Sequence, residues 1–104
     1  MTEVCTVNYI DHVGVAVEDI DVAMAFFKKV FNVPDAEIVL LEDQGVRATL
    51  IEVGQTRLEL LEPTSPETGV GKFIERRGEG LHHLAFNVTD IGGKLQTLKT
   101  LGID

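Results

Sequence analysis

The stretch IDHVGVAVEDI at residues 10–20 decides the fold, because it recurs 71 positions later as LHHLAFNVTDI at residues 81–91. Identical residues stand at four equivalent places: His12 and His83, Val17 and Val88, Asp19 and Asp90, and Ile20 and Ile91. Similarity at a fixed spacing indicates a duplicated structural unit. We therefore expect two modules that begin alike.

Each copy begins with a run in which apolar residues alternate with others. One face of each run is branched or aromatic: Val13, Val15 and Val17, and then Leu84, Phe86 and Val88. The opposite face carries a histidine beside smaller side chains: His12, Gly14 and Ala16, and then His83, Ala85 and Asn87. A period of two predicts a strand. We expect the first face to pack under a helix and the second to leave space for a ligand.

A helix is expected after each strand, because an aspartate suited to cap a helix follows both runs. After Asp19, apolar residues recur at helical spacing and predict the buried stripe Val22, Ala23, Phe26, Phe27, Val30 and Phe31. After Asp90 the stripe is weaker, and consists of Leu95, Leu98 and Leu101. Gly92 and Gly93 each cost that second helix about 1 kcal/mol.

Three more strands complete the first module, at residues 36–41, 46–53 and 56–61. The break at Gly54-Gln55 is short enough for an antiparallel hairpin between the last two. A connection rich in proline, threonine, serine and glycine follows, with a short helix at about residues 71–77. The expected order in a module is strand, helix and three strands.

Composition indicates one ordinary folded domain, with 104 residues, of which 44% are hydrophobic and 25% charged. The net charge of −8 disfavours binding to nucleic acid or to anionic membranes. Cys5 is the single cysteine, and neither a secretion leader nor 18 consecutive apolar residues are found in the sequence. We expect a cytoplasmic protein without membrane or nucleic-acid partners.

His12 and His83 are candidate metal ligands, since equivalent strands related by a pseudo-twofold axis would turn both imidazoles toward one cavity. The alternation in residues 58–61 places the Glu59 carboxylate on the face opposite two leucines, where it could reach the same cavity. The alternative for each residue is a polar side chain on a half-exposed strand. His82 is expected to point to the opposite side of its strand, in a supporting role.

Three segments resemble methylmalonyl-CoA epimerases of the vicinal oxygen chelate superfamily, which includes glyoxalases, bleomycin resistance proteins and dioxygenases. They are IDHVGVAV at residues 10–17, LELLEP at residues 58–63 and KFIERRGEGLHHLAF at residues 72–86. The resemblance implies an α+β fold in which two βαβββ modules surround a divalent metal. It also implies that His12, Glu59 and His83 bind that metal, with a further glutamate on the final strand of the second module.

That final strand is not in this sequence, so the second module is expected to be incomplete, as in a chain truncated at its C-terminus. We expect a single domain over residues 1–104, with module one at about 8–63, a linker and short helix at 64–80, and partial module two at 81–104. Unpaired strand edges favour a homodimer.

The resemblance implies a metal-dependent epimerase that removes the proton α to the thioester carbonyl of methylmalonyl-CoA and returns it on the opposite face. Its substrate would be an acyl-CoA, and its metal cobalt by resemblance, although manganese, nickel or zinc also suits these ligands. No catalytic base is assigned, because Ala48 stands where some family members have a carboxylate. The alternatives are an enzyme resembling lactoylglutathione lyase and a non-catalytic binding module or fragment.

Overall fold

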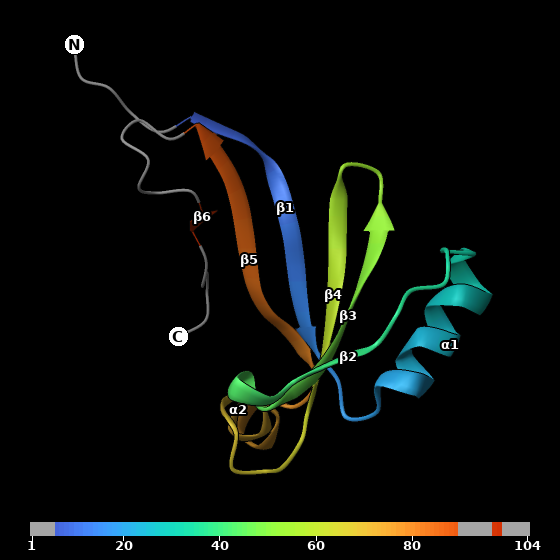
Figure 1. Ribbon diagram of the computed structural model, residues 1–104, viewed down its shortest axis with the longest axis vertical. Helices are drawn as coiled ribbons and strands as arrows, with labels where there is room; N and C mark the ends of the chain where they lie inside the picture. Colours follow the sequence, from blue (N-terminus) through green and yellow to red (C-terminus); the bar gives the residue numbers. More distant parts are fainter. Residues whose placement is uncertain (1–5, 90–96, 99–104) are drawn as a thin grey trace.

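A six-stranded mixed sheet with two helices makes up the part of the chain that the computed structural model describes, residues 6–89 and 97–98 (Figure 1). The elements in chain order are β1 (Thr6–Ala16), α1 (Ile20–Phe31), β2 (Val39–Leu41), a 3₁₀ helix η1 (Glu42–Gln44), β3 (Val46–Val53), β4 (Thr56–Pro63), α2 (Gly69–Arg77), β5 (Gly80–Thr89) and β6 (Thr97–Leu98). This arrangement confirms the α+β class.

The two repeated segments form neighbouring strands near the middle of the sheet. The strand order is β2-β3-β4-β1-β5-β6, in which β1 runs parallel to β4 and antiparallel to β5. The expected hairpin is confirmed: β3 and β4 pair from Val53 and Thr56 onward, and Gly54 turns the chain with a φ of 63°. Positive φ is easy for glycine and strained for residues with a Cβ.

Helix α1 begins as predicted but buries a different stripe. The Asp19 carboxylate accepts hydrogen bonds from the backbone N–H groups of Asp21 and Val22, as a helix cap does. The side chains that pack on the sheet are Ile20, Ala23, Met24 and Phe27. Four members of the predicted stripe are more than half exposed, namely Val22, Phe26, Val30 and Phe31. Apolar residues occupy two overlapping stripes of this helix, and only one of them can face the sheet.

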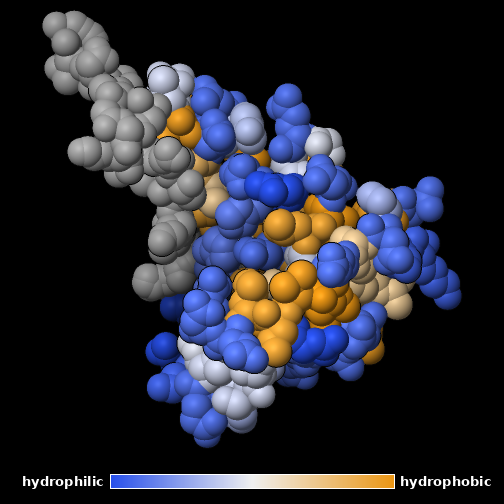
Figure 2. Space-filling model, viewed as in Figure 1, coloured by the Kyte–Doolittle hydropathy of each residue, from blue (hydrophilic) through white to orange (hydrophobic). Residues whose placement is uncertain are grey.

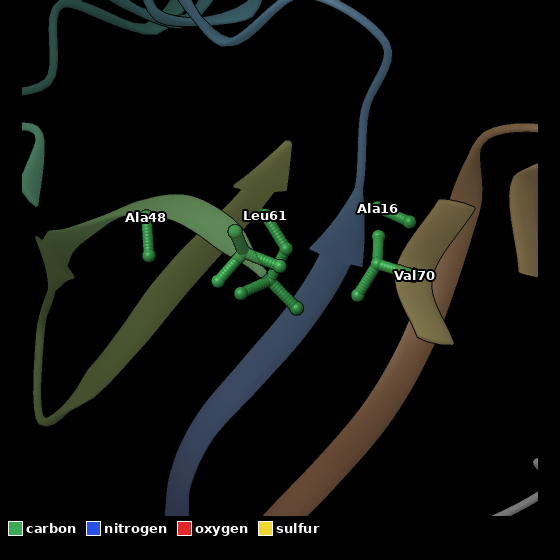
Figure 3. Packing of buried hydrophobic residues seen from close by; sticks show 5 residues of the cluster. Ala16, Ala48, Leu61 and Val70 are labelled. Carbon is green, nitrogen blue, oxygen red and sulfur yellow. The ribbon is translucent and has the colours of Figure 1, made fainter. Parts of the chain in front are cut away.

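Helix α2 covers the opposite face of the sheet at the end near Ala16. It begins at Gly69, two residues before the predicted start, because the Thr68 hydroxyl caps it by accepting from the Gly71 N–H. Figure 3 shows Val70 of this helix beside Ala16 of β1, with Leu61 and Ala48 of the hairpin completing the cluster. The two faces of the sheet therefore have separate apolar clusters.

Two predicted elements differ from the structure. The strand expected at residues 36–41 is reduced to β2, since the preceding backbone bonds to a side chain: the Thr49 hydroxyl donates to the Glu37 carbonyl oxygen. The prediction of a helix after Asp90 is wrong for Thr97 and Leu98. These two residues form strand β6, which pairs with the otherwise open edge of β5. The remainder of that predicted helix, and Cys5, lie outside the described residues.

Apolar side chains are also found at the surface. Figure 2 shows hydrophobic surface across the middle of one face, surrounded by hydrophilic surface. Within the described ranges, no helix combines the length and the apolar character needed to cross a membrane.

Replacing Leu60 by alanine should lower the free energy of unfolding by about 2–5 kcal/mol, because this fully buried side chain is at the centre of the cluster under α1. Urea denaturation followed by circular dichroism measures the change. The matched control is Leu40→Ala, which removes a side chain that is 52% exposed and should cost less than about 1 kcal/mol. Equal losses in the two variants would contradict the packing described above.

Candidate metal centre

The pairing of β1 with β5 gives the two modules a local twofold relation. Val13 pairs with Leu84, and on either side of this pair His12 lies opposite Ala85 and Gly14 lies opposite His83. Directly opposed residues on antiparallel strands project to the same face. Each histidine therefore lies across from a small residue of the other module, which leaves room for both imidazoles on one face.

Glu59 enters the same site from β4. It pairs with Gly14 in the parallel ladder, so Gly14 has Glu59 on one side and His83 on the other. The Nε2 atoms of His12 and His83 are 3.2 Å apart. The Glu59 Oε1 atom is 3.6 Å from Nε2 of His12 and 3.4 Å from Nε2 of His83. The structure thus brings together all three side chains that the sequence predicted as ligands.

This donor set fits a divalent cation. Atoms bound about 2.0–2.2 Å from one cation lie roughly 3–3.6 Å from one another in tetrahedral or octahedral geometry. The three separations between the His12, Glu59 and His83 donor atoms fall in this range. All three side chains are half-buried, with side-chain exposures of 23%, 19% and 19%. The three side chains are therefore largely shielded from bulk water but still partly accessible to it.

Asp11 is a residue of the site that the sequence interpretation missed. Its carboxylate oxygen Oδ2 lies 2.9 Å from Nδ1 of His12 and accepts a hydrogen bond of 2.8 Å from the Arg57 guanidinium. The bond from His12 lowers the pKa of Asp11 below its ordinary value, burial opposes this, and Arg57 lowers the pKa further. Asp11 is therefore a carboxylate at neutral pH, and His12 donates the proton of this bond.

The expected position of His82 is wrong. In a regular strand His82 would point away from His83, but its Nδ1 atom lies 2.9 Å from Nδ1 of His83. The ladder shifts register here, since Gly14 pairs with His83 while Val15 pairs with Leu81, and His82 is the extra residue. Burial lowers the pKa of His82, as does the charge of His83, while Glu59 acts in the opposite direction.

A hollow of about 390 Å³ lies beside Glu59 and is lined mostly by apolar side chains. Its lining includes Ala48 and Leu50 of β3, Val39 of β2, and also Glu37. Ala48 is buried, so this strand offers a methyl group at the position where the resemblance places a carboxylate in some relatives. Another apolar hollow, of about 410 Å³, lies between α1 and the sheet and includes none of the three candidate ligands.

Comparison with known proteins defines the class to which this site belongs. A sequence model of the Glyoxalase/Bleomycin resistance protein/Dioxygenase superfamily matches residues 11–104. The chain belongs to this superfamily.

Within the superfamily, the similar proteins include methylmalonyl-CoA epimerases. The human mitochondrial methylmalonyl-CoA epimerase is 31% identical over 91 residues, which are 86% of this chain and 52% of that protein. The crystal structure of methylmalonyl-CoA epimerase from Mycobacterium tuberculosis is 31% identical with a TM-score of 0.76, covering 88% of this chain and 62% of that one. A variant of the Streptomyces coelicolor methylmalonyl-CoA epimerase, in complex with 2-nitronate-propionyl-CoA, is 34% identical with a TM-score of 0.75, covering 83% and 66%. The chain thus spans between half and two thirds of these relatives.

Gly14→Ala should weaken binding of a divalent cation at least tenfold. An added Cβ would lie 2.6 Å from Nδ1 and 2.7 Å from Nε2 of His83, so the imidazole must move out of the site. Competition with a chromophoric chelator for Co²⁺ measures the affinity. The control is Gly69→Ala at the start of α2, where a Cβ meets no atom within 4 Å. Unchanged Co²⁺ affinity in a folded Gly14→Ala protein would contradict the placement of His83.

Proposed function

We propose that this chain acts as a metal-dependent methylmalonyl-CoA epimerase. The observation that carries the proposal is the convergence of His12, Glu59 and His83, three side chains from three strands with donor atoms 3.2–3.6 Å apart. Catalytic metal sites commonly use three protein ligands and keep a position open for substrate. The similarity to several methylmalonyl-CoA epimerases at 31–34% identity supports the choice of substrate.

When bound, the divalent metal supplies a Lewis acid that stabilises the enolate formed from the thioester. His12 and His83 would each offer a neutral imidazole, and Glu59 would supply the one negative charge among the three ligands. Asp11 holds the Nδ1 proton of His12, so the Nε2 atom of this ring is free to face the cation.

The hollow beside Glu59 is suited to the acyl part of the substrate. The side chains of Ala48, Leu50 and Val39 present an apolar surface next to Glu59, where the substrate's methyl group can be buried. The small Ala48 side chain leaves this space open. We assign no residue as the base that takes the α proton.

The proposal further includes a homodimer in the cytoplasm, a single domain over residues 1–104 with two modules at about 8–63 and 81–104, and cobalt as the metal. Metal analysis and reconstitution with cobalt, manganese, nickel and zinc in turn would rank the metals by restored activity. Analytical ultracentrifugation would give the oligomeric state.

Isotope exchange tests the reaction. One epimer of methylmalonyl-CoA is incubated with the Co²⁺-reconstituted protein in deuterated water, and the product is examined by NMR. Epimerisation with deuterium at the α carbon is expected, and a chelator should abolish both. Turnover of a glutathione hemithioacetal in place of methylmalonyl-CoA would show a lyase. Neither reaction, with less than about a tenth of an equivalent of bound metal, would show a non-catalytic module.

Glu59→Gln should lower kcat/KM by roughly 10–100-fold or more, since it removes the only negative charge among the three ligands and weakens metal binding. Epimerisation rates are measured at several Co²⁺ concentrations, where part of the loss should be recovered by excess metal. Glu42→Gln is the matched control, because Glu42 is exposed in η1 and outside the site. A Glu59→Gln protein with full activity and metal content would overturn the ligand assignment.

A further inference from the structure

Three irregularities interrupt the ladder between β1 and β5, and two of them lie on opposite sides of the local twofold; the third lies between Val7 and Tyr9. On β1, Ile10 pairs with Phe86 and His12 with Ala85, so Asp11 is an extra residue without a directly opposed partner. On β5 the extra residue is His82. Asp11 and His82 are equivalent in the 71-residue repeat, and each immediately precedes a candidate metal ligand. Both modules therefore have a β-bulge at the same place.

Each bulged residue bonds to the ring that follows it. The Asp11 Oδ2 atom is 2.9 Å from Nδ1 of His12, and the His82 Nδ1 atom is 2.9 Å from Nδ1 of His83. In a regular strand, successive side chains point to opposite faces and such a contact between neighbours is unfavourable. A bulge re-aims one side chain at the expense of regular ladder pairing. Both modules thus lose regular pairing and gain the same type of contact.

We propose that Asp11 and His82 are positioning residues, which orient the two imidazoles and fix their tautomers so that both Nε2 atoms face the metal. This inference rests on the metal site of the proposed function. A carboxylate only accepts hydrogen bonds, so Asp11 requires the proton of His12 to be on Nδ1. For His83 the same tautomer requires that its Nδ1–H donate to an unprotonated Nδ1 of His82, whose own proton is then on Nε2. In each ring the lone pair is then on Nε2, the atom that points to Glu59.

Other elements hold the two positioning residues in place. Arg57 of β4 donates to the same Asp11 oxygen that contacts His12, at 2.8 Å. The ring of Phe73 in α2 packs edge-on against His82, with ring centroids 4.9 Å apart. Asp11 is therefore fixed by charge and His82 by packing. We expect Asp11 to have the larger effect, because it is the one that combines a negative charge with the hydrogen bond.

The first experiment uses the metal-free protein and does not depend on function. Long-range ¹H–¹⁵N NMR of protein with labelled histidine, at about pH 8 where an unperturbed imidazole is neutral, reports which nitrogen of each ring carries the proton. His12 is expected in the Nδ1–H form in the native chain and in the control Asp43→Ala in exposed η1, and to lose this preference in Asp11→Ala. Asp11→Asn should also weaken the preference, because an amide can donate a hydrogen bond to Nδ1 as well as accept one from it. An unchanged His12 tautomer in folded Asp11→Ala would overturn the inference for this ring.

The second experiment measures Co²⁺ affinity and the visible absorption spectrum of the bound metal. Asp11→Ala should weaken Co²⁺ binding roughly 10–100-fold and shift the cobalt absorption bands. His82→Phe should weaken Co²⁺ binding by a smaller factor. His82→Asp copies the Asp11 arrangement into the second module, so its Co²⁺ affinity should be higher than that of His82→Phe and close to native. Asp43→Ala in η1 is the control and should change neither quantity. Affinities within twofold of native in both Asp11→Ala and His82→Phe would overturn the positioning role.

The two experiments separate the inference from the proposed function. If the native chain binds no metal while Asp11→Ala changes the His12 tautomer, the proposed function fails and the control of the ring by Asp11 stands. If the native chain binds metal and the variants match it, the positioning role fails and the proposed function stands.

Discussion

The antiparallel pairing of β1 with β5 about the Val13–Leu84 pair is the constraint on which the rest of the structure depends. It fixes which residues are opposed, and so places each histidine across from a glycine or an alanine of the other module. With a larger side chain at Gly14, the His83 imidazole would have no room. The parallel pairing of β1 with β4 then brings Glu59 to the same point. The registers of β1 with β5 and with β4 together determine the whole donor set.

One face of the sheet packs against a helix and stabilises the fold, and the other face carries the candidate metal site. One face packs against α1 through fully buried side chains such as Ile20 and Leu60. Among the residues that the structure describes, α2 covers the other face near one end, and the polar cluster lies half-buried beside a hollow. Polar groups that must exchange water for a ligand are stable in such a place, because partial exposure lowers the cost of their desolvation. The candidate site of this chain thus lies on the less covered face of the described sheet.

Sequence patterns predicted β1, β3, β4 and β5, and the repeat placed His12 and His83 on one face, because period-two alternation reports side-chain direction directly. The ligand role of Glu59 came from the family resemblance, since alternation showed only that its carboxylate could reach the same face. The patterns failed where local geometry departs from the regular period. Alternation assigns His82 to the face opposite His83, but the bulge turns its side chain to the same face as His83. Nothing in the composition of that segment marks the extra residue. The repeat did contain a signal for Asp11, since it lies over His82 in the other module. The α1 stripe failed for a different reason, because apolar residues on both sides of the helix give two equally regular patterns.

X-ray absorption at the cobalt edge of the reconstituted protein tests the central claim most directly, since it counts the imidazoles bound to the metal. The account predicts two histidine rings at about 2.0–2.2 Å with oxygen ligands beside them, and one ring after His12→Ala. A native spectrum with no imidazole scattering, or one that is unaltered by His12→Ala, would contradict a metal centre built from the two repeated strands.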